Sequence, residues 1–301
     1  MVRRGYCAAA LLALLAFLGG CAYPSPARLV LEHDPDRSGV GGEHGPFGVA
    51  REAALTTVHA DDALRYEVFW PAEDDLSVDE GPFPHVVLLP PSFATPSQLH
   101  WLAVWMASVG HVVVVPRADF DLVSGQYANA DLALDAVRGR AVDPDDLLAD
   151  ALAPDAPGAI VGHGTGGTVA LNRWLSRPGL YCTTAAIAAL PERRVVYEAG
   201  TDRRSVFLVG AEDGIVTASA VSSAWAGMPE PSTLAVVDGM TYYDWLDQTT
   251  ESQRSLEGTP TRAQSETRGD ALDVVRAWLD ATVGDRPDAL DTLDLAGVEV
   301  Q

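Results

Sequence analysis

Residues 160–167 carry the pattern with the clearest chemical meaning in this 301-residue chain. Their sequence, Ile-Val-Gly-His-Gly-Thr-Gly-Gly, predicts a buried strand, a tight glycine turn and a helix over residues 168–175. Hydrolytic enzymes use the motif G-x-S-x-G at such a turn to present a nucleophilic serine. Gly164 stands at the serine position, so the nucleophile that the motif requires is missing.

The general base of this chemistry is also absent from its usual place. In enzymes with this motif the catalytic triad follows the chain order serine, acid, histidine. No histidine follows Gly164, so a triad in that order cannot form. The histidines of the chain are His33, His44, His59, His85, His100, His111 and His163.

Apolar runs on both sides of the glycine turn predict further strands. They cover residues 85–93, 110–116, 205–213 and 233–242, and the last two end in turns that read G-x-x-D and G-x-x-Y. Helical spacing follows at residues 101–109, and residues 271–282 have the apolar face of an amphipathic helix. Strands that alternate with helices in this way favour an α/β fold.

With these motifs, residues 45–283 resemble bacterial α/β-hydrolases of the dienelactone hydrolase and polyester-hydrolase (cutinase-like) group. The resemblance implies a three-layer α/β-hydrolase-like fold, with a mostly parallel sheet and helices on both faces. It also implies that the family's acid falls on Asp213 and its histidine on Tyr242. The triad positions therefore read Gly164, Asp213 and Tyr242.

The resemblance places the oxyanion loop, often P-G-x in this group, on Pro90-Pro91-Ser92. Thr165 takes the position whose backbone N–H completes the oxyanion hole. A tyrosine at the histidine position has a pKa near 10 and is a poor base at neutral pH. We therefore expect a catalytically inactive domain with a binding or structural role.

A working carboxylic-ester hydrolase with a relocated triad is the alternative. Its nucleophile would be Ser92 or Thr165, and its base His163 or His100. His163 precedes the glycine turn, where a packing role is the simpler interpretation.

Aromatic residues near the ends of the predicted strands suggest a ligand cleft, because α/β sheets bind ligands at the carboxyl ends of their strands. Such a cleft would suit an apolar or aromatic small molecule; alternatively, the aromatic rings plug the old pocket. The candidate cleft residues are Phe93, Tyr127, Trp225, Tyr243 and Trp245. No spacing of acids, histidines or cysteines matches a metal site, and no cofactor is expected.

The N-terminus has the features of a bacterial lipoprotein signal. Two arginines precede an apolar run at residues 8–17, and Leu18-Gly19-Gly20-Cys21 looks like a lipobox. We expect lipidation of Cys21, export to the bacterial cell envelope and attachment to a membrane, without an indication of which leaflet. Cys7 lies in the signal, so Cys182 is the only other thiol of the lipidated chain.

The net charge of −22 argues against nucleic acid as a partner, since phosphate backbones bind basic surfaces. The sequence does not indicate an oligomeric state. We divide the chain into a signal peptide (1–20), a tether (21–47), an α/β-hydrolase-like domain (48–284) and an acidic C-terminal tail (285–301). Proline in the second segment and aspartate in the last predict loosely attached chain in both.

Overall fold

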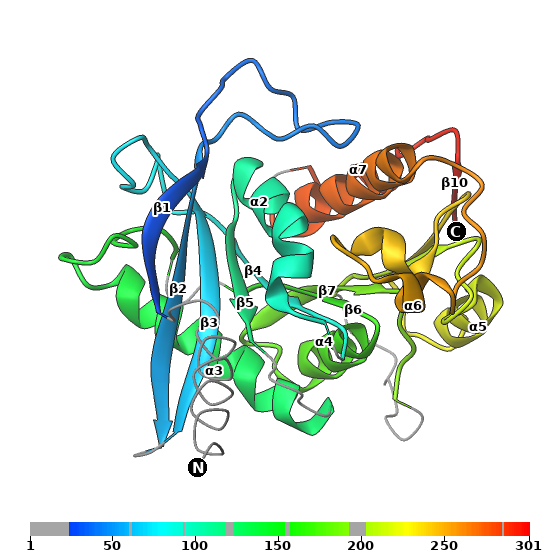
Figure 1. Cartoon of the computed structure of the whole chain (residues 1–301), viewed down its shortest axis with the longest axis horizontal. Helices are drawn as coiled ribbons and strands as arrows, with labels where there is room; N and C mark the ends of the chain where they lie inside the picture. The colour runs from blue at the N-terminus through cyan, green and yellow to red at the C-terminus, as the bar shows by residue number, and fades with distance from the viewer. Residues whose placement is uncertain are drawn as a thin grey trace, which may run out of the picture.

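A ten-stranded sheet in the order β1-β2-β3-β5-β4-β6-β7-β8-β9-β10 forms the centre of the molecule (Figure 1). The computed structural model describes residues 24–59, 62–92, 94–117, 123–153, 157–192, 203–284 and 286–301. The strands are β1 (Ser25–Leu31), β2 (Val49–His59), β3 (Asp62–Pro71), β4 (His85–Leu89), β5 (Val112–Pro116), β6 (Gly158–His163), β7 (Tyr181–Ile187), β8 (Ser205–Gly210), β9 (Ser232–Val237) and β10 (Val298–Val300). The pairings from β5 to β9 are parallel, and those at the two ends of the sheet are antiparallel.

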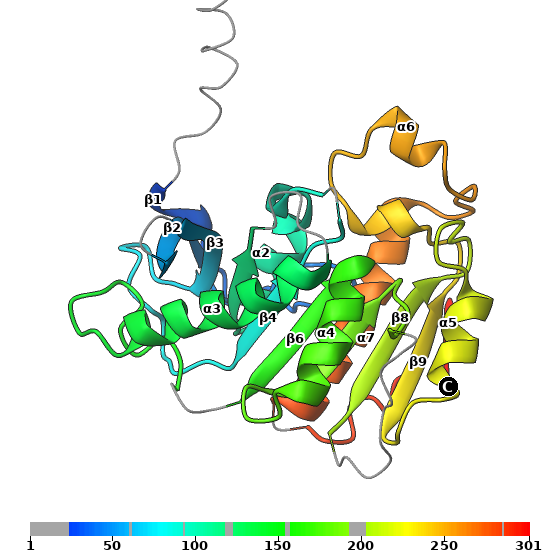
Figure 2. The ribbon, with the colours of Figure 1, turned by 90° about the horizontal axis from the view of Figure 1, so that it is seen from below.

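Helices cover both faces of this sheet, which makes a three-layer α/β fold (Figure 2). On one face lie α2 (His100–Ser108) and α7 (Gln264–Thr282). On the other lie α3 (Val123–Ala141), α4 (Thr165–Ser176) and α5 (Ala218–Trp225). Shorter elements are the 3₁₀ turns η1 (Pro96–Leu99) and η2 (Tyr242–Trp245) and the one-turn helix α6 (Glu251–Arg254).

The central strands are apolar on both faces, and the sequence shows this as continuous apolar runs. In β4, Val86 and Leu88 belong to the core under α2 and α7, while Val87 and Leu89 belong to the core under α3 and α4. All residues of β4, β5, β6 and β8 are buried. Parallel strands that are covered by helices on both sides have this composition, so the expected fold class is confirmed.

Two segments that we expected to be loosely attached belong to the sheet instead. The predicted tether contains β1, which pairs with β2, and the loop that follows is fixed where Asp34 N–H donates to the Pro46 carbonyl at 2.9 Å. The predicted acidic tail contains β10, which pairs with β9, and its Leu290 is buried. Both predictions were wrong because strand pairing joins residues far apart in sequence, which local composition does not record.

The helices are longer than their sequence signals. Helix α4 begins at Thr165, directly after the glycine turn, and α7 begins at Gln264 rather than at Ala271. Thr267 and Gly269, in the added part of α7, are buried. Among the described residues, no helix has the length and apolar character needed to cross a bilayer.

Candidate functional site

Gly164 forms the turn between β6 and α4. Its backbone has φ 56° and ψ −119°, a conformation that residues with a side chain adopt only at a cost. Its N–H donates to the Ile187 carbonyl at 2.9 Å, and its own carbonyl accepts from Thr168 N–H at 3.2 Å. A residue with a side chain would be strained at this position, and hydrolases present their nucleophile on a strained strand-to-helix turn of this kind.

Close packing between strand and helix explains two neighbouring glycines. A Cβ added at Gly162 would collide with the backbone of Gly166, and one added at Gly166 would collide with the carbonyl of Leu89. The pattern G-x-G-x-G thus has a steric cause that does not depend on catalysis.

Tyr242 lies directly against Gly164. It opens η2, after the turn that ends β9, and its side chain is buried. A Cβ added at Gly164 would collide with the hydroxyl oxygen of Tyr242, and it would lie 3.2 Å from Cβ of Pro91. The tyrosine hydroxyl thus occupies the space that a nucleophilic side chain would need.

The rings around Tyr242 fix its position. The centres of the His163 and Tyr242 rings are 4.3 Å apart. The Tyr243 ring meets the Tyr242 ring edge-on, with 5.1 Å between their centres. Burial raises the pKa of the Tyr242 phenol, and the nearby Tyr243, Asp213 and Glu257 raise it further. The phenol stays protonated at neutral pH and cannot serve as a general base.

Asp213 lies in the turn after β8, with its carboxyl group buried. Its Oδ1 accepts hydrogen bonds from the N–H groups of Ile215, at 2.8 Å, and Val216, at 2.7 Å. Its Oδ2 is buried and has no hydrogen-bond partner among the described residues. Burial raises the pKa of Asp213 to about 6, against the opposing effect of the two backbone hydrogen bonds.

Ser92 and Thr165, the two positions that the resemblance assigns to the oxyanion hole, contact each other. The Ser92 N–H donates to Thr165 Oγ1 at 2.6 Å, and the two hydroxyl oxygens are 2.9 Å apart. The Ser92 N–H, which the loop would offer to an oxyanion, therefore already donates to the Thr165 side chain.

The residues of the alternative triad are not assembled. The Ser92 and Thr165 hydroxyls bond to each other, and neither ring nitrogen of His163 bonds to a hydroxyl in the described chain. Burial lowers the pKa of His163 to about 3, so it is a neutral packing residue. His100 lies against β3, where its Nε2 is 2.6 Å from the Glu67 carboxylate.

No protein-family model matches this chain, and no curated protein matches its sequence significantly.

The predicted cleft residues do not form one wall. Tyr243 and Trp245 pack in the core under α2 and α7, whereas Tyr127 and Trp225 pack in the core on the other side of the sheet. Phe93 and the predicted lipidation residue Cys21 lie outside the described residues. No group of three or more potential metal ligands lies in the part of the chain that the structure describes.

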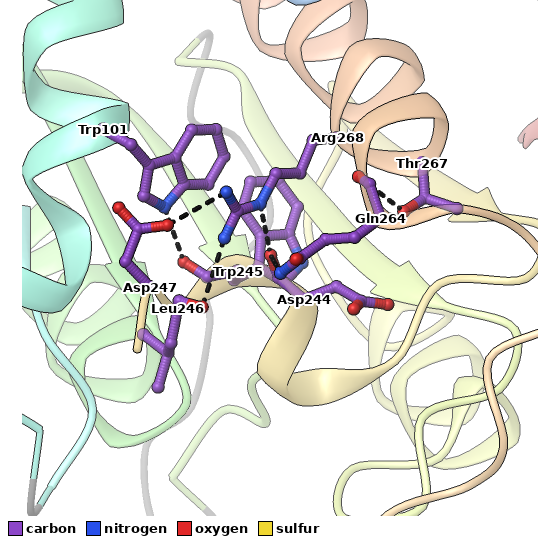
Figure 3. A network of polar contacts seen from close by, with 8 residues as sticks. All are labelled: Trp101, Asp244, Trp245, Leu246, Asp247, Gln264, Thr267 and Arg268. Carbon is purple, nitrogen blue, oxygen red and sulfur yellow. Dashed lines mark hydrogen bonds and ion pairs between the residues drawn. The ribbon is translucent and has the colours of Figure 1, made fainter. Parts of the chain in front are cut away.

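Arg268, which the sequence did not single out, holds the segment that carries Tyr242 (Figure 3). From α7 its guanidinium donates to the carbonyls of Asp244, at 2.7 Å, and Leu246, at 3.1 Å. It pairs with the Asp247 carboxylate at 3.0 Å and lies 4.2 Å from the centre of the Trp101 ring.

Two further contacts reinforce this hold. Trp101 Nε1 donates to the Trp245 carbonyl at 3.0 Å, which joins α2 to the same turn (Figure 3). At the start of η2, the Asp244 carboxylate accepts from Thr241 N–H at 2.8 Å. Thr241 and Asp244 form a capping box at this helix start, and the sequence pattern T-x-x-D is a signal for it. The long-range contacts of Arg268 have no such signal in the sequence.

Proposed function

We propose that this chain carries an α/β-hydrolase-type domain without hydrolytic activity, which acts as a binding or structural protein of a bacterial envelope. The observation that carries the proposal is the position of the Tyr242 hydroxyl in the space above Gly164. A nucleophile cannot stand there unless Tyr242 moves. The family assignment itself is supported by the strained turn at Gly164 and by the acid turn at Asp213.

Magnitudes favour a complete loss of activity. In a serine protease, removal of the nucleophile or the histidine lowers kcat by about 2 × 10⁶, and about 10³–10⁴ over water remains from the oxyanion hole and binding. Here the nucleophile and histidine positions are Gly164 and Tyr242, and the Ser92 N–H is already bonded to Thr165. The residual oxyanion contribution is therefore reduced as well.

The proposed ligand is an apolar or aromatic small molecule. Its support is two aromatic contacts at the turn after β9, Tyr243 against Tyr242 and Trp101 against Trp245, in which Trp101 and Tyr243 remain partly exposed. Hydrophobic and aromatic side chains with few polar groups are typical of small-molecule sites.

Short p-nitrophenyl esters and a fluorophosphonate probe test the absence of catalysis. We expect no turnover above the buffer rate and no covalent labelling. Turnover that disappears in Ser92→Ala or Thr165→Ala would contradict the proposal and support the relocated triad. Cys182→Ser serves as the matched control, because Cys182 lies at the start of β7, away from the turn at Gly164.

The proposed location is the membrane, through lipid on Cys21. Fractionation of cells that express the full chain tests it. We expect the wild type in the membrane fraction, and Cys21→Ser either released or retained as an unprocessed precursor. A Cys21→Ser variant that fractionates and migrates like the wild type would contradict the anchor.

A further inference from the structure

The chain enters the fold on the side of the sheet where the parallel strands have their carboxyl ends, called the carboxyl edge below. The candidate site lies on the same side. Strand β1 is antiparallel to β2, β2 to β3 and β3 to β5, so β1 runs opposite to β5 and to the strands parallel with it. Its first residue, Ser25, therefore lies toward the carboxyl ends of the central strands. Figure 2 shows the start of β1 and the loop around α6 on the same, upper side of the molecule.

The covalent distance from Cys21 to this edge is short. Pro24 is the first described residue, and it precedes β1 directly. Three residue steps separate it from Cys21, and a fully extended chain covers about 10 Å in three steps. A lipid on Cys21 would hold the domain close to the bilayer, because the long tether expected from the sequence does not exist.

Exposed apolar side chains lie on the loops at this edge. Leu256 follows α6 and is 67% exposed, and Ile215 follows the Asp213 turn and is 41% exposed. Their loops touch, since a Cβ added at Gly214 would lie 2.6 Å from the Gly258 nitrogen. Leu190, at the end of β7, is also exposed and bonds through its carbonyl to Thr168 on α4.

Exposure alone does not select this edge. Val142 follows α3 at the opposite end of the central strands and is 62% exposed, and Leu147 near it is also exposed. What distinguishes the two edges is the entry of the chain, which lies only at the first.

We propose that the carboxyl edge of the sheet faces the lipid bilayer, with Leu256, Ile215 and Leu190 in contact with its surface. The inference rests on the lipid anchor of the proposed function and adds an orientation to it. Electrostatic attraction does not contribute, since the net charge is −22 and anionic lipids repel it. The proposed partner is the neutral lipid of the bilayer surface, touched by apolar side chains and held by the anchor.

Contact quenching measures this orientation. The full chain, expressed in cells and extracted from their membranes, carries Cys182→Ser together with Leu256→Cys or Val142→Cys and a bimane label at the new thiol. Each protein is reconstituted into phosphatidylcholine vesicles with or without bromine on the acyl chains near the headgroup. We expect brominated lipid to quench the label at position 256 at least twofold more than the label at position 142.

Equal quenching at the two positions, or stronger quenching at 142, would overturn the orientation. Membrane fractionation of the same proteins and of Cys21→Ser separates this failure from failure of the anchor. If the Leu256→Cys and Val142→Cys proteins fractionate with membranes and Cys21→Ser is released or stays as an unprocessed precursor, the anchor stands whatever the quenching shows. If none fractionates with membranes, both the anchor and the orientation fail.

Discussion

The turns after β8 and β9 lie side by side at the same edge of the sheet but have opposite characters. The turn after β8 keeps an acid, Asp213, whose buried Oδ2 has no hydrogen-bond partner in the described part of the chain. The turn after β9 carries Tyr242, and Arg268 holds the segment that follows it through two carbonyls and one carboxylate. The first turn thus retains an unused polar group, whereas the second is tied in place.

This difference teaches how backbone and side chains contribute separately to such a site. The strained turn at Gly164 and the hydrogen bonds to Asp213 Oδ1 come from the backbone geometry of the fold. The chemistry depends on the side chains at positions 164 and 242. Gly164 has no nucleophilic side chain, and the Tyr242 hydroxyl fills the space that one would need. The backbone geometry of such a turn can therefore be present without the side chains that hydrolysis requires.

The largest effect on stability is expected for Gly164→Ala. Backbone strain of about 1–3 kcal/mol and a similar cost of overpacking against Tyr242 together predict a loss of about 4 kcal/mol. In a Tyr242→Phe background the colliding hydroxyl is absent, so the same substitution should cost at least about 1 kcal/mol less. Urea unfolding of the four proteins measures this coupling.

Gly179→Ala provides the matched control. A Cβ at Gly179 meets no atom within 4 Å, so a change below about 0.5 kcal/mol is expected. If Gly164→Ala lowers stability equally in the wild-type and Tyr242→Phe backgrounds, the Tyr242 hydroxyl does not occupy the space of the nucleophile.

A smaller effect is expected for Arg268→Met. It leaves the Leu246 carbonyl without its donor and removes the contact with the Trp101 ring, for an expected loss of about 3 kcal/mol. Hydrogen exchange at the amides of residues 242–247 should accelerate more than exchange in β9.

The stability of Arg268→Lys should lie between that of the wild type and that of Arg268→Met. Lysine keeps the positive charge but cannot donate in three directions from a planar group. Arg254→Met is the matched control, since the Arg254 side chain is exposed and donates only to Thr249 among the described contacts. If Arg268→Met leaves exchange at residues 242–247 unchanged, the turn after β9 does not depend on this arginine.

The smallest effect concerns Asp213 and pH. Its pKa rises from 3.8 to about 6 on folding, so the folded state binds more protons between these values. Stability contributed by this group is therefore lost as pH rises from about 4 to about 6, by about 2 kcal/mol. Asp213→Asn should be more stable than the wild type at pH 7 and no more stable at pH 4, as measured by urea unfolding. A difference between the two proteins that does not vary with pH would contradict the raised pKa.

The sequence predicted the central part of the sheet well. Strands β4, β5, β6 and β8 are buried on both faces, and each therefore appears as an apolar run that ends in a turn. Strands β1 and β10 were missed because they lie at the two ends of the sheet, where each is only partly buried and includes polar residues.

The sequence indicated where the candidate site residues lie along the chain, but it did not indicate their contacts. The chain order placed Gly164, Asp213 and Tyr242 after three strands that end at one edge. The collision between Tyr242 and position 164, and the bond from Ser92 N–H to Thr165, depend on side-chain directions in three dimensions. The expected cleft residues do not share one wall for the same reason, since Tyr127 and Trp225 pack on the other face of the sheet from Tyr243 and Trp245.

The central claim is that this site is a hydrolase site blocked at two positions, and ester hydrolysis by Gly164→Ser/Tyr242→His tests it most directly. The double variant replaces the blocking phenol with a base. Asp213 Oδ2, which has no hydrogen-bond partner among the residues that the structure describes, can accept an imidazole N–H. We predict hydrolysis of p-nitrophenyl acetate at least about tenfold faster than by either single variant, since a nucleophile without a base gains little. If the folded double variant is no faster than the single variants, also with Pro91→Gly added to open the oxyanion loop, these positions do not form a hydrolase site and the account is contradicted.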